Sequence, residues 1–131
     1  MSSLSRENII ELIETKGYDI NLSGLNLSGL DLSGLTLIKA NLSQADLSRA
    51  NLSGANLYMA DLTNADLTNA EIVWANLSES RLDGADLGGA NLTGTLFYLT
   101  KIIGAKFSPG ELTGDQHLQS LGLKKRWNKL F

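Results

Sequence analysis

The chain has 131 residues, no cysteine and a single histidine, which excludes disulfides and cysteine-based metal sites and leaves almost no room for a histidine-containing catalytic triad. Its formal net charge of -3 argues against a general nucleic-acid backbone binder. Hydrophobic residues make up 43% of the chain but aromatic residues only 6%, so we expect a core of leucine and alanine.

Residues 1–19 are predicted to form an N-terminal cap built around a helix at 5–16. Ser5 is placed to cap the start of this helix, and Gly17 is placed to end it. An apolar face comes from Ile9, Ile10, Leu12 and Ile13. No basic segment leads into an apolar run, so we expect neither a signal peptide nor a transmembrane segment, and the expected location is cytoplasmic.

Residues 20–109 divide into 18 consecutive blocks of five, without insertion or deletion. Position 3 of each block is Leu, Ile or Phe, position 1 is mostly Ala, position 2 is mostly Asn or Asp, and position 5 is often Gly. A period of five matches neither a helix nor a long strand, so the chain must bend once per block. Positions 1 and 3 can then face inward together, with a type II turn at position 5. The pattern predicts a solenoid.

Blocks such as Ala45-Asp46-Leu47-Ser48-Arg49 resemble the A(D/N)LXX pattern of the pentapeptide-repeat family, which is abundant in cyanobacteria. The resemblance implies an all-β solenoid, a right-handed quadrilateral β-helix with four blocks per coil. Eighteen blocks would then make about 4.5 coils at one strand spacing per coil. Residues 20 apart should stack on one face. The first coil departs from the pattern, because position 1 holds Leu25, Leu30 and Leu35, which we interpret as packing against the N-terminal helix.

Residues 110–131 are predicted to form a C-terminal cap. Ser108-Pro109-Gly110 ends the repeat, Asp115 is placed to cap a short helix through Leu121, and Gly122 is placed to end it. The segment 123–131 is basic and apolar. It is expected either to cover the last coil through Trp127, Leu130 or Phe131, or to form a dimer contact or docking peptide.

The fourth face carries the blocks centred on Leu37, Leu57, Leu77 and Phe97. Its outward positions hold apolar side chains where the repeat elsewhere has Ser, Thr, Gly or Asn. Tyr58, Trp74 and Tyr98 are expected to converge on one corner, and such a patch usually marks a contact with a partner or a second copy. Two structural alternatives remain open, namely that a terminal segment covers the patch or that the stacked aromatic rings stabilise the sheet. The full candidate patch is Ile38, Tyr58, Met59, Val73, Trp74, Leu96, Tyr98 and Leu99.

A second candidate surface is a column of three aspartates, Asp46, Asp66 and Asp86, at position 2 of the second face. Some members of the family inhibit DNA gyrase by imitating the nucleic-acid backbone, and an acidic column would suit that role. A solvated face with the usual choice of Asp or Asn is the structural alternative.

We therefore expect a non-enzymatic module for protein–protein interaction or structure, whose biological role the sequence does not name. The alternative is a DNA-mimicking inhibitor or protector of DNA gyrase or another topoisomerase. No catalytic residue, cofactor or metal site is predicted, and we expect no direct binding of nucleic acid or membrane.

Overall fold

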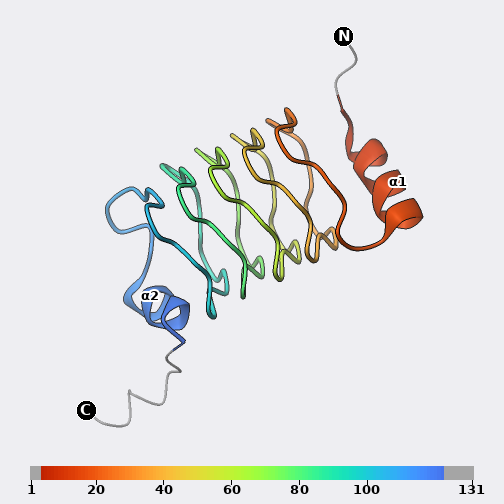
Figure 1. Ribbon diagram of the computed structural model, residues 1–131. Helices are drawn as coiled ribbons and strands as arrows, with labels where there is room; N and C mark the ends of the chain where they lie inside the picture. Colours follow the sequence, from red (N-terminus) through yellow and green to blue (C-terminus); the bar gives the residue numbers. More distant parts are fainter. Residues whose placement is uncertain (1–3, 123–131) are drawn as a thin grey trace.

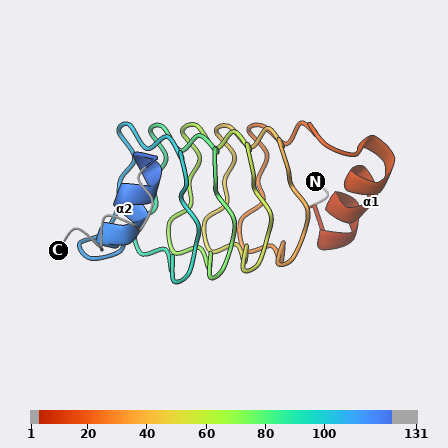
Figure 2. The same cartoon turned by 90° about the horizontal axis from the view of Figure 1, so that it is seen from below.

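The structure, a computed structural model, describes residues 4–122. A stack of coils lies between two helices, with α1 (Arg6–Lys16) at one end and α2 (Gly114–Ser120) at the other (Figures 1 and 2). Since the helices occupy the ends, the sides of the stack are formed by the repeat alone.

The coils are held together by parallel bridges between residues 20 apart, from Asn21 with Asn41 to Asp86 with Lys106. Each bridge residue is at position 2, so one coil contains four blocks, as expected. The amide of Leu62 donates to the carbonyl of Arg81 in the next coil at 2.7 Å, and the amide of Asp61 donates to Ala40 in the preceding coil at 2.9 Å. Within residues 4–122 these bridges stay isolated and never extend into longer strands, because the chain turns again after every fifth residue.

A hydrogen-bonded turn closes nearly every block, as the amide of Ala65 donating to the carbonyl of Leu62 at 3.0 Å illustrates. In every block from 20–24 to 100–104 the fifth residue has a positive φ, between 55° and 75°. The fourth residue does not, which is the pattern of a type II turn. The same conformation is adopted by residues as large as Trp74 and Leu99, so position 5 tolerates side chains besides glycine.

The core is a ladder of position-3 side chains flanked by position-1 alanines, and the position-3 leucines from Leu22 to Leu92 are at most 3% exposed. Three polar residues replace alanine at position 1, and their hydroxyls donate to carbonyls. Ser80 and Thr100 both bond to the carbonyl of Leu77 at 2.6 Å, and Thr95 bonds to that of Ile72. These substitutions therefore leave no side-chain hydroxyl unpaired in the interior.

Helix α1 begins and ends as predicted. The Ser5 hydroxyl accepts from the Asn8 amide at 3.2 Å, and the Asn8 side chain accepts from the Ser5 amide at 2.8 Å. Ile9 is completely buried and belongs to the same apolar cluster as the repeat leucines. Leu30 and Leu35 are partly buried, whereas Leu25 remains 36% exposed and is therefore less covered than expected.

Helix α2 begins at Gly114, and its cap differs from the prediction. Thr113, not Asp115, forms the reciprocal pair of bonds, its hydroxyl accepting from the Gln116 amide while its own amide donates to the Gln116 side chain. A threonine followed three residues later by glutamine is itself a capping-box sequence. Asp115 lies in the first turn of the helix. The prediction that Trp127, Leu130 or Phe131 covers the last coil concerns residues outside those described.

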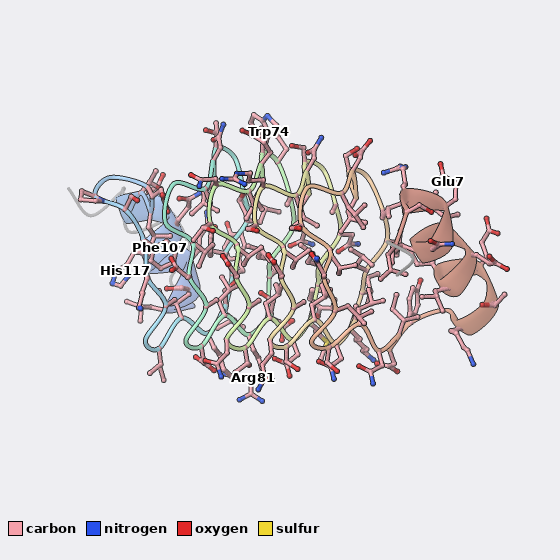
Figure 3. The ribbon with its side chains drawn as sticks, turned by 90° about the horizontal axis from the view of Figure 1, so that it is seen from above. Glu7, Trp74, Arg81, Phe107 and His117 are labelled. Carbon is pink, nitrogen blue, oxygen red and sulfur yellow. The ribbon has the colours of Figure 1, made fainter. Side chains whose placement is uncertain are left out.

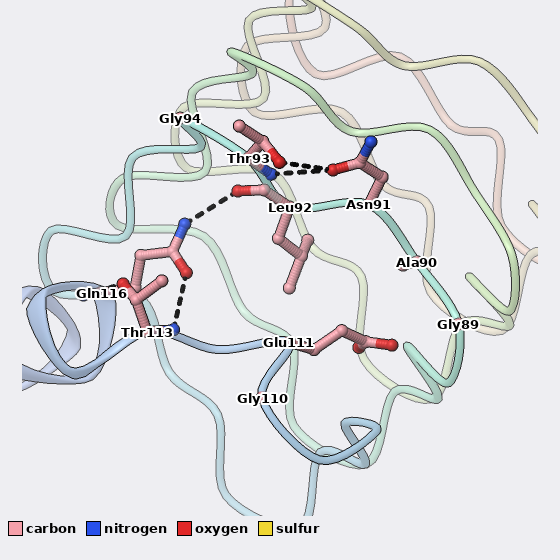
Figure 4. A pocket seen from close by; sticks show the side chains of 10 residues that line it. All are labelled: Gly89, Ala90, Asn91, Leu92, Thr93, Gly94, Gly110, Glu111, Thr113 and Gln116. Carbon is pink, nitrogen blue, oxygen red and sulfur yellow. Dashed lines mark hydrogen bonds between the residues drawn. The ribbon is translucent and has the colours of Figure 1, made fainter.

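Two glutamines of α2 take the place of a further coil. The Gln116 side-chain amide donates to the carbonyl of Leu92 at 2.8 Å (Figure 4) and to that of Thr95 at 3.2 Å. The Gln119 side-chain oxygen accepts from the Phe97 amide, and its carbonyl accepts from the Leu99 amide, both at 2.9 Å. Helix α2 thus bonds the backbone groups of Thr95, Phe97 and Leu99 that a next coil would otherwise bond.

Candidate functional site

The predicted aromatic cluster is divided between two successive turns of the coil. Trp74 lies in the turn closed by the bond from Ala75 to Ile72, before the fourth face begins. Tyr58 and Tyr98 lie in the turns that follow that face, so the expectation of one shared corner is wrong. Figure 3 shows the Trp74 side chain projecting from the stack on the side opposite Arg81, while Phe107 and His117 lie at the α2 end.

Trp74 is 72% exposed, yet its ring is supported by the coil beneath it. A Cβ atom added to Gly94, the residue 20 positions later, would lie 2.6 Å from Cδ2 of the ring. The other residues of this column are glycines, namely Gly34, Gly54 and Gly94. The indole therefore lies against a turn that is flat because glycine has no side chain. The outer face of the indole is exposed to solvent.

Replacing Gly94 by alanine should destabilise the protein by about 2 kcal/mol, because the new Cβ displaces the Trp74 ring and alanine is strained at a φ of 70°. In a Trp74→Gly background the same change should cost only about 1 kcal/mol, since only the backbone strain remains. Urea unfolding of the four proteins in this double-mutant cycle measures the difference. Equal costs in both backgrounds would mean that the ring does not rest on Gly94.

Leu96 breaks the repeat on the fourth face. Its column neighbours Asn56 and Asn76 accept a bond from the amide two residues later, at 3.1 Å and 2.9 Å. Leu96 has no side-chain oxygen and cannot accept from the Tyr98 amide in that way. It is nevertheless 43% exposed, so the substitution neither fills the core nor caps the turn.

The remaining members of the predicted patch are hydrogen-bonded, half-buried or part of a groove. The Tyr58 hydroxyl donates to the Glu79 carboxylate at 2.5 Å, and this bond, together with the negative charge of Glu79, raises the pKa of Tyr58. Tyr58 therefore has a partner within the fold, which sequence reasoning missed although the spacing places the two residues on adjacent coils. Three others are half-buried, namely Ile38, Val73 and Tyr98. Met59 and Leu99 line a groove beside α2.

The aspartates of the second face stack in register, as predicted, through bridges from Asp46 to Asp66 and from Asp66 to Asp86. One oxygen of each carboxylate is bonded within its own turn, as where Asp46 accepts from the Ser48 hydroxyl at 2.6 Å and from the Ser48 amide at 3.0 Å. Asn41 does the same with Ser43. Where a position-2 side chain bonds its own turn, an amide oxygen therefore serves as well as a carboxylate, and the column ends at Lys106.

The hydroxyl and amide of Ser48 hold the pKa of Asp46 below its usual range of about 3.9. Because the folded-state pKa is the lower one, the carboxylate contributes stability that is present above pH of about 4 and is lost as pH falls through the folded value. An Asp46→Asn variant keeps the turn bonds without this titration. Its melting temperature should therefore fall less steeply in acid than that of the wild type, and Asn51→Asp should make the fall steeper. Identical acid profiles would contradict this assignment.

A cavity of about 450 Å³ separates residues 89–94 from the segment leading into α2 (Figure 4). The Glu111 side chain extends toward Gly89 and Ala90, and neither of its buried carboxylate oxygens has a hydrogen-bond partner within the described part of the chain. No lysine, arginine or histidine among the described residues lines the cavity. An unpaired buried carboxylate is costly.

Glu111→Gln should therefore raise the free energy of unfolding by about 1 kcal/mol, because a neutral amide of the same shape loses less hydration on burial. Chemical denaturation measures the change, with Glu7→Gln on the exposed surface of α1 as the control. A destabilised Glu111→Gln protein would mean that the charge at this position has a favourable partner.

The described residues contain no group of three or more His, Asp or Glu side chains arranged to hold a metal ion. Neither α1 nor α2 is long and apolar enough to cross a membrane.

The geometry defines a solenoid protein with five-residue blocks, four to a coil. A family profile described as pentapeptide repeats (8 copies) matches residues 18–54, 45–84 and 80–114. The chain belongs to the pentapeptide-repeat family, and membership implies a right-handed quadrilateral β-helix.

Three solved structures of pentapeptide repeat proteins are similar to this chain. The pentapeptide repeat protein Rfr23 from the cyanobacterium Cyanothece 51142 is 37% identical over 70% of this chain and 59% of its own, with a TM-score of 0.58. The protein alr5209 from Nostoc PCC 7120 is 28% identical over 82% of this chain and 100% of its own, with a TM-score of 0.68.

HetL, a protein involved in heterocyst differentiation regulation from Nostoc sp. strain PCC 7120, is 28% identical over 76% of this chain and 53% of its own, with a TM-score of 0.55. The chain spans less than two thirds of the length of Rfr23 and of HetL. No curated protein matches the chain.

Proposed function

We propose that the protein is a non-enzymatic binding module that presents Trp74 and Leu96 to a protein partner. The observation that carries the proposal is that both residues break the repeat while remaining exposed, at 72% and 43%. Glycine and asparagine occupy the equivalent places in neighbouring coils and suit the turn better. Departures from a structural rule without a structural gain are typical of functional positions.

A capture experiment tests this proposal. Immobilised wild-type protein is compared with Trp74→Gly/Leu96→Asn, which restores the repeat residues, and with Tyr18→Ser/Leu25→Ser, which removes exposed apolar side chains near α1. A partner should be retained by the wild type and by the second variant but not by the first. Retention should change little with salt, because apolar contacts are not screened. A partner retained equally by all three proteins would overturn the proposal.

The second candidate is the gyrase-directed mimic, which the in-register stacking of Asp46, Asp66 and Asp86 favours. Replacing all three by asparagine removes the charges and keeps the turn bonds, as Asn41 and Asn51 demonstrate elsewhere. Mimicry predicts that binding disappears in this variant and weakens steeply as salt rises. Binding that survives both treatments would exclude mimicry.

A further inference from the structure

A groove of about 500 Å³ lies between the last coil and α2, on the side of the stack that α2 does not close. Its floor and one wall come from residues 99–103, and the other wall comes from His117, Ser120 and Leu121. Three apolar side chains along it are exposed, with Ile103 at 81%, Leu121 at 60% and Leu99 at 52%.

Backbone amides of the last coil beside this groove also lack hydrogen-bond acceptors. In earlier coils the amides at positions 3 and 5 donate to the next coil, as those of Leu82 and Gly84 donate to Lys101 and Ile103. The corresponding amides one coil later belong to Ile102 and Gly104. They have no acceptor among residues 4–122, and neither do those of Leu92 and Gly94, whereas the amides of Phe97 and Leu99 donate to Gln119. The groove therefore combines exposed apolar side chains with open backbone donors, as a site for an extended segment does.

The chain itself continues from the edge of the groove. Leu121 forms part of the wall, and a Cβ on Gly122 would lie 2.8 Å from the Leu99 side chain, so the last described residues already touch it. Nine residues follow, with the sequence Leu-Lys-Lys-Arg-Trp-Asn-Lys-Leu-Phe. Fully extended they reach at most about 30 Å, far more than the width of one coil face. They contain four large apolar and four basic residues, and the groove is lined by one acidic and one lysine side chain, Glu79 and Lys101.

We propose that residues 123–131 dock in this groove of their own chain, where their backbone accepts hydrogen bonds from Ile102 and Gly104 and their apolar side chains cover Leu99 and Ile103. The basic residues then lie toward solvent and Glu79. The docked segment completes the end of the stack that α2 leaves open. This inference is independent of the proposed partner surface at Trp74 and Leu96.

Trp127 provides a direct probe, because the chain has only two tryptophans. In the full chain with Trp74→Phe, fluorescence reports Trp127 alone. Docking predicts emission at shorter wavelength than in urea and at least a twofold reduction in acrylamide quenching. Adding Ile103→Glu should return quenching to the unfolded value without altering the far-UV circular dichroism, since Ile103 is 81% exposed. Tyr18→Glu, 60% exposed near α1, is the matched control and should change nothing.

Three results would overturn the inference. Trp127 as accessible in the folded protein as in urea would mean that the segment does not dock. Protection that persists in the Ile103→Glu protein would place the segment elsewhere. Protection that is lost on dilution would assign the groove to a second copy of the chain.

Discussion

Replacing Leu62 by lysine should leave the chain largely unfolded at room temperature. Leu62 is completely buried at the middle of the leucine ladder, and its loss alone removes about 2 kcal/mol of burial. The buried ammonium adds a penalty of several kcal/mol, because the buried polar residues of the described chain are all uncharged. A domain of this size has only about 5–15 kcal/mol of stability, so one such change uses most of it.

Circular dichroism and urea denaturation test the Leu62→Lys prediction, with Gln44→Lys as the control. Gln44 is exposed at position 5, where Lys39 already adopts the same positive φ, so the control adds the same charge without burying it. The control should keep the wild-type unfolding midpoint. A folded Leu62→Lys protein with a midpoint near that of the wild type would contradict the buried ladder.

Gln116→Leu should cost about 3 kcal/mol, although leucine is the more hydrophobic residue. The Gln116 side chain is 6% exposed and donates to the carbonyls of Leu92 and Thr95 while also closing the capping box with Thr113. Leucine would leave the Thr95 carbonyl buried without a donor, at roughly 1–3 kcal/mol, and would also remove the capping bond, whereas the Leu92 carbonyl would keep the bond from the Thr95 amide. Removing one group of a satisfied buried network is expensive for this reason.

The measurement is the free energy of unfolding in urea, with Gln44→Leu as the control. Position 5 accepts leucine at Leu99, so the control should stay within about 0.5 kcal/mol of the wild type. If Gln116→Leu is equally harmless, the end of the stack does not depend on α2.

The period of five allowed the coil, the buried position-3 ladder and the in-register Asp column to be predicted, because a strict repeat fixes which residues face inward. The helix cap by Ser5 could also be predicted, because it depends only on residues that are neighbours in the sequence. The roles of Gln116 and Gln119 were not, because they depend on how a seven-residue helix lies over a coil more than 20 residues earlier. The signal in the sequence for such a role is a pair of glutamines three residues apart, shortly after the repeat ends.

The sequence predicted which apolar side chains occupy outward positions, but it did not predict how the turns separate them. Stacking by 20 residues brought Leu96 and the Tyr58 column to one face, yet the turns on either side of that face separate Trp74 from the tyrosines. Tyr58 proved to be paired with Glu79, a contact between positions 4 and 5 of successive coils that column counting alone does not show. Leu96 and Trp74 remain as the exposed residues for which the fold has no requirement.

Trp74 and Leu96 are proposed to serve binding rather than folding. The unfolding free energy of Trp74→Gly/Leu96→Asn tests this proposal, because both substitutions restore the residues that neighbouring coils use. We expect a value equal to or above that of the wild type, because the asparagine that replaces Leu96 gains the turn bond that leucine cannot make. A loss of about 2 kcal/mol or more would show instead that the two side chains hold the coils together.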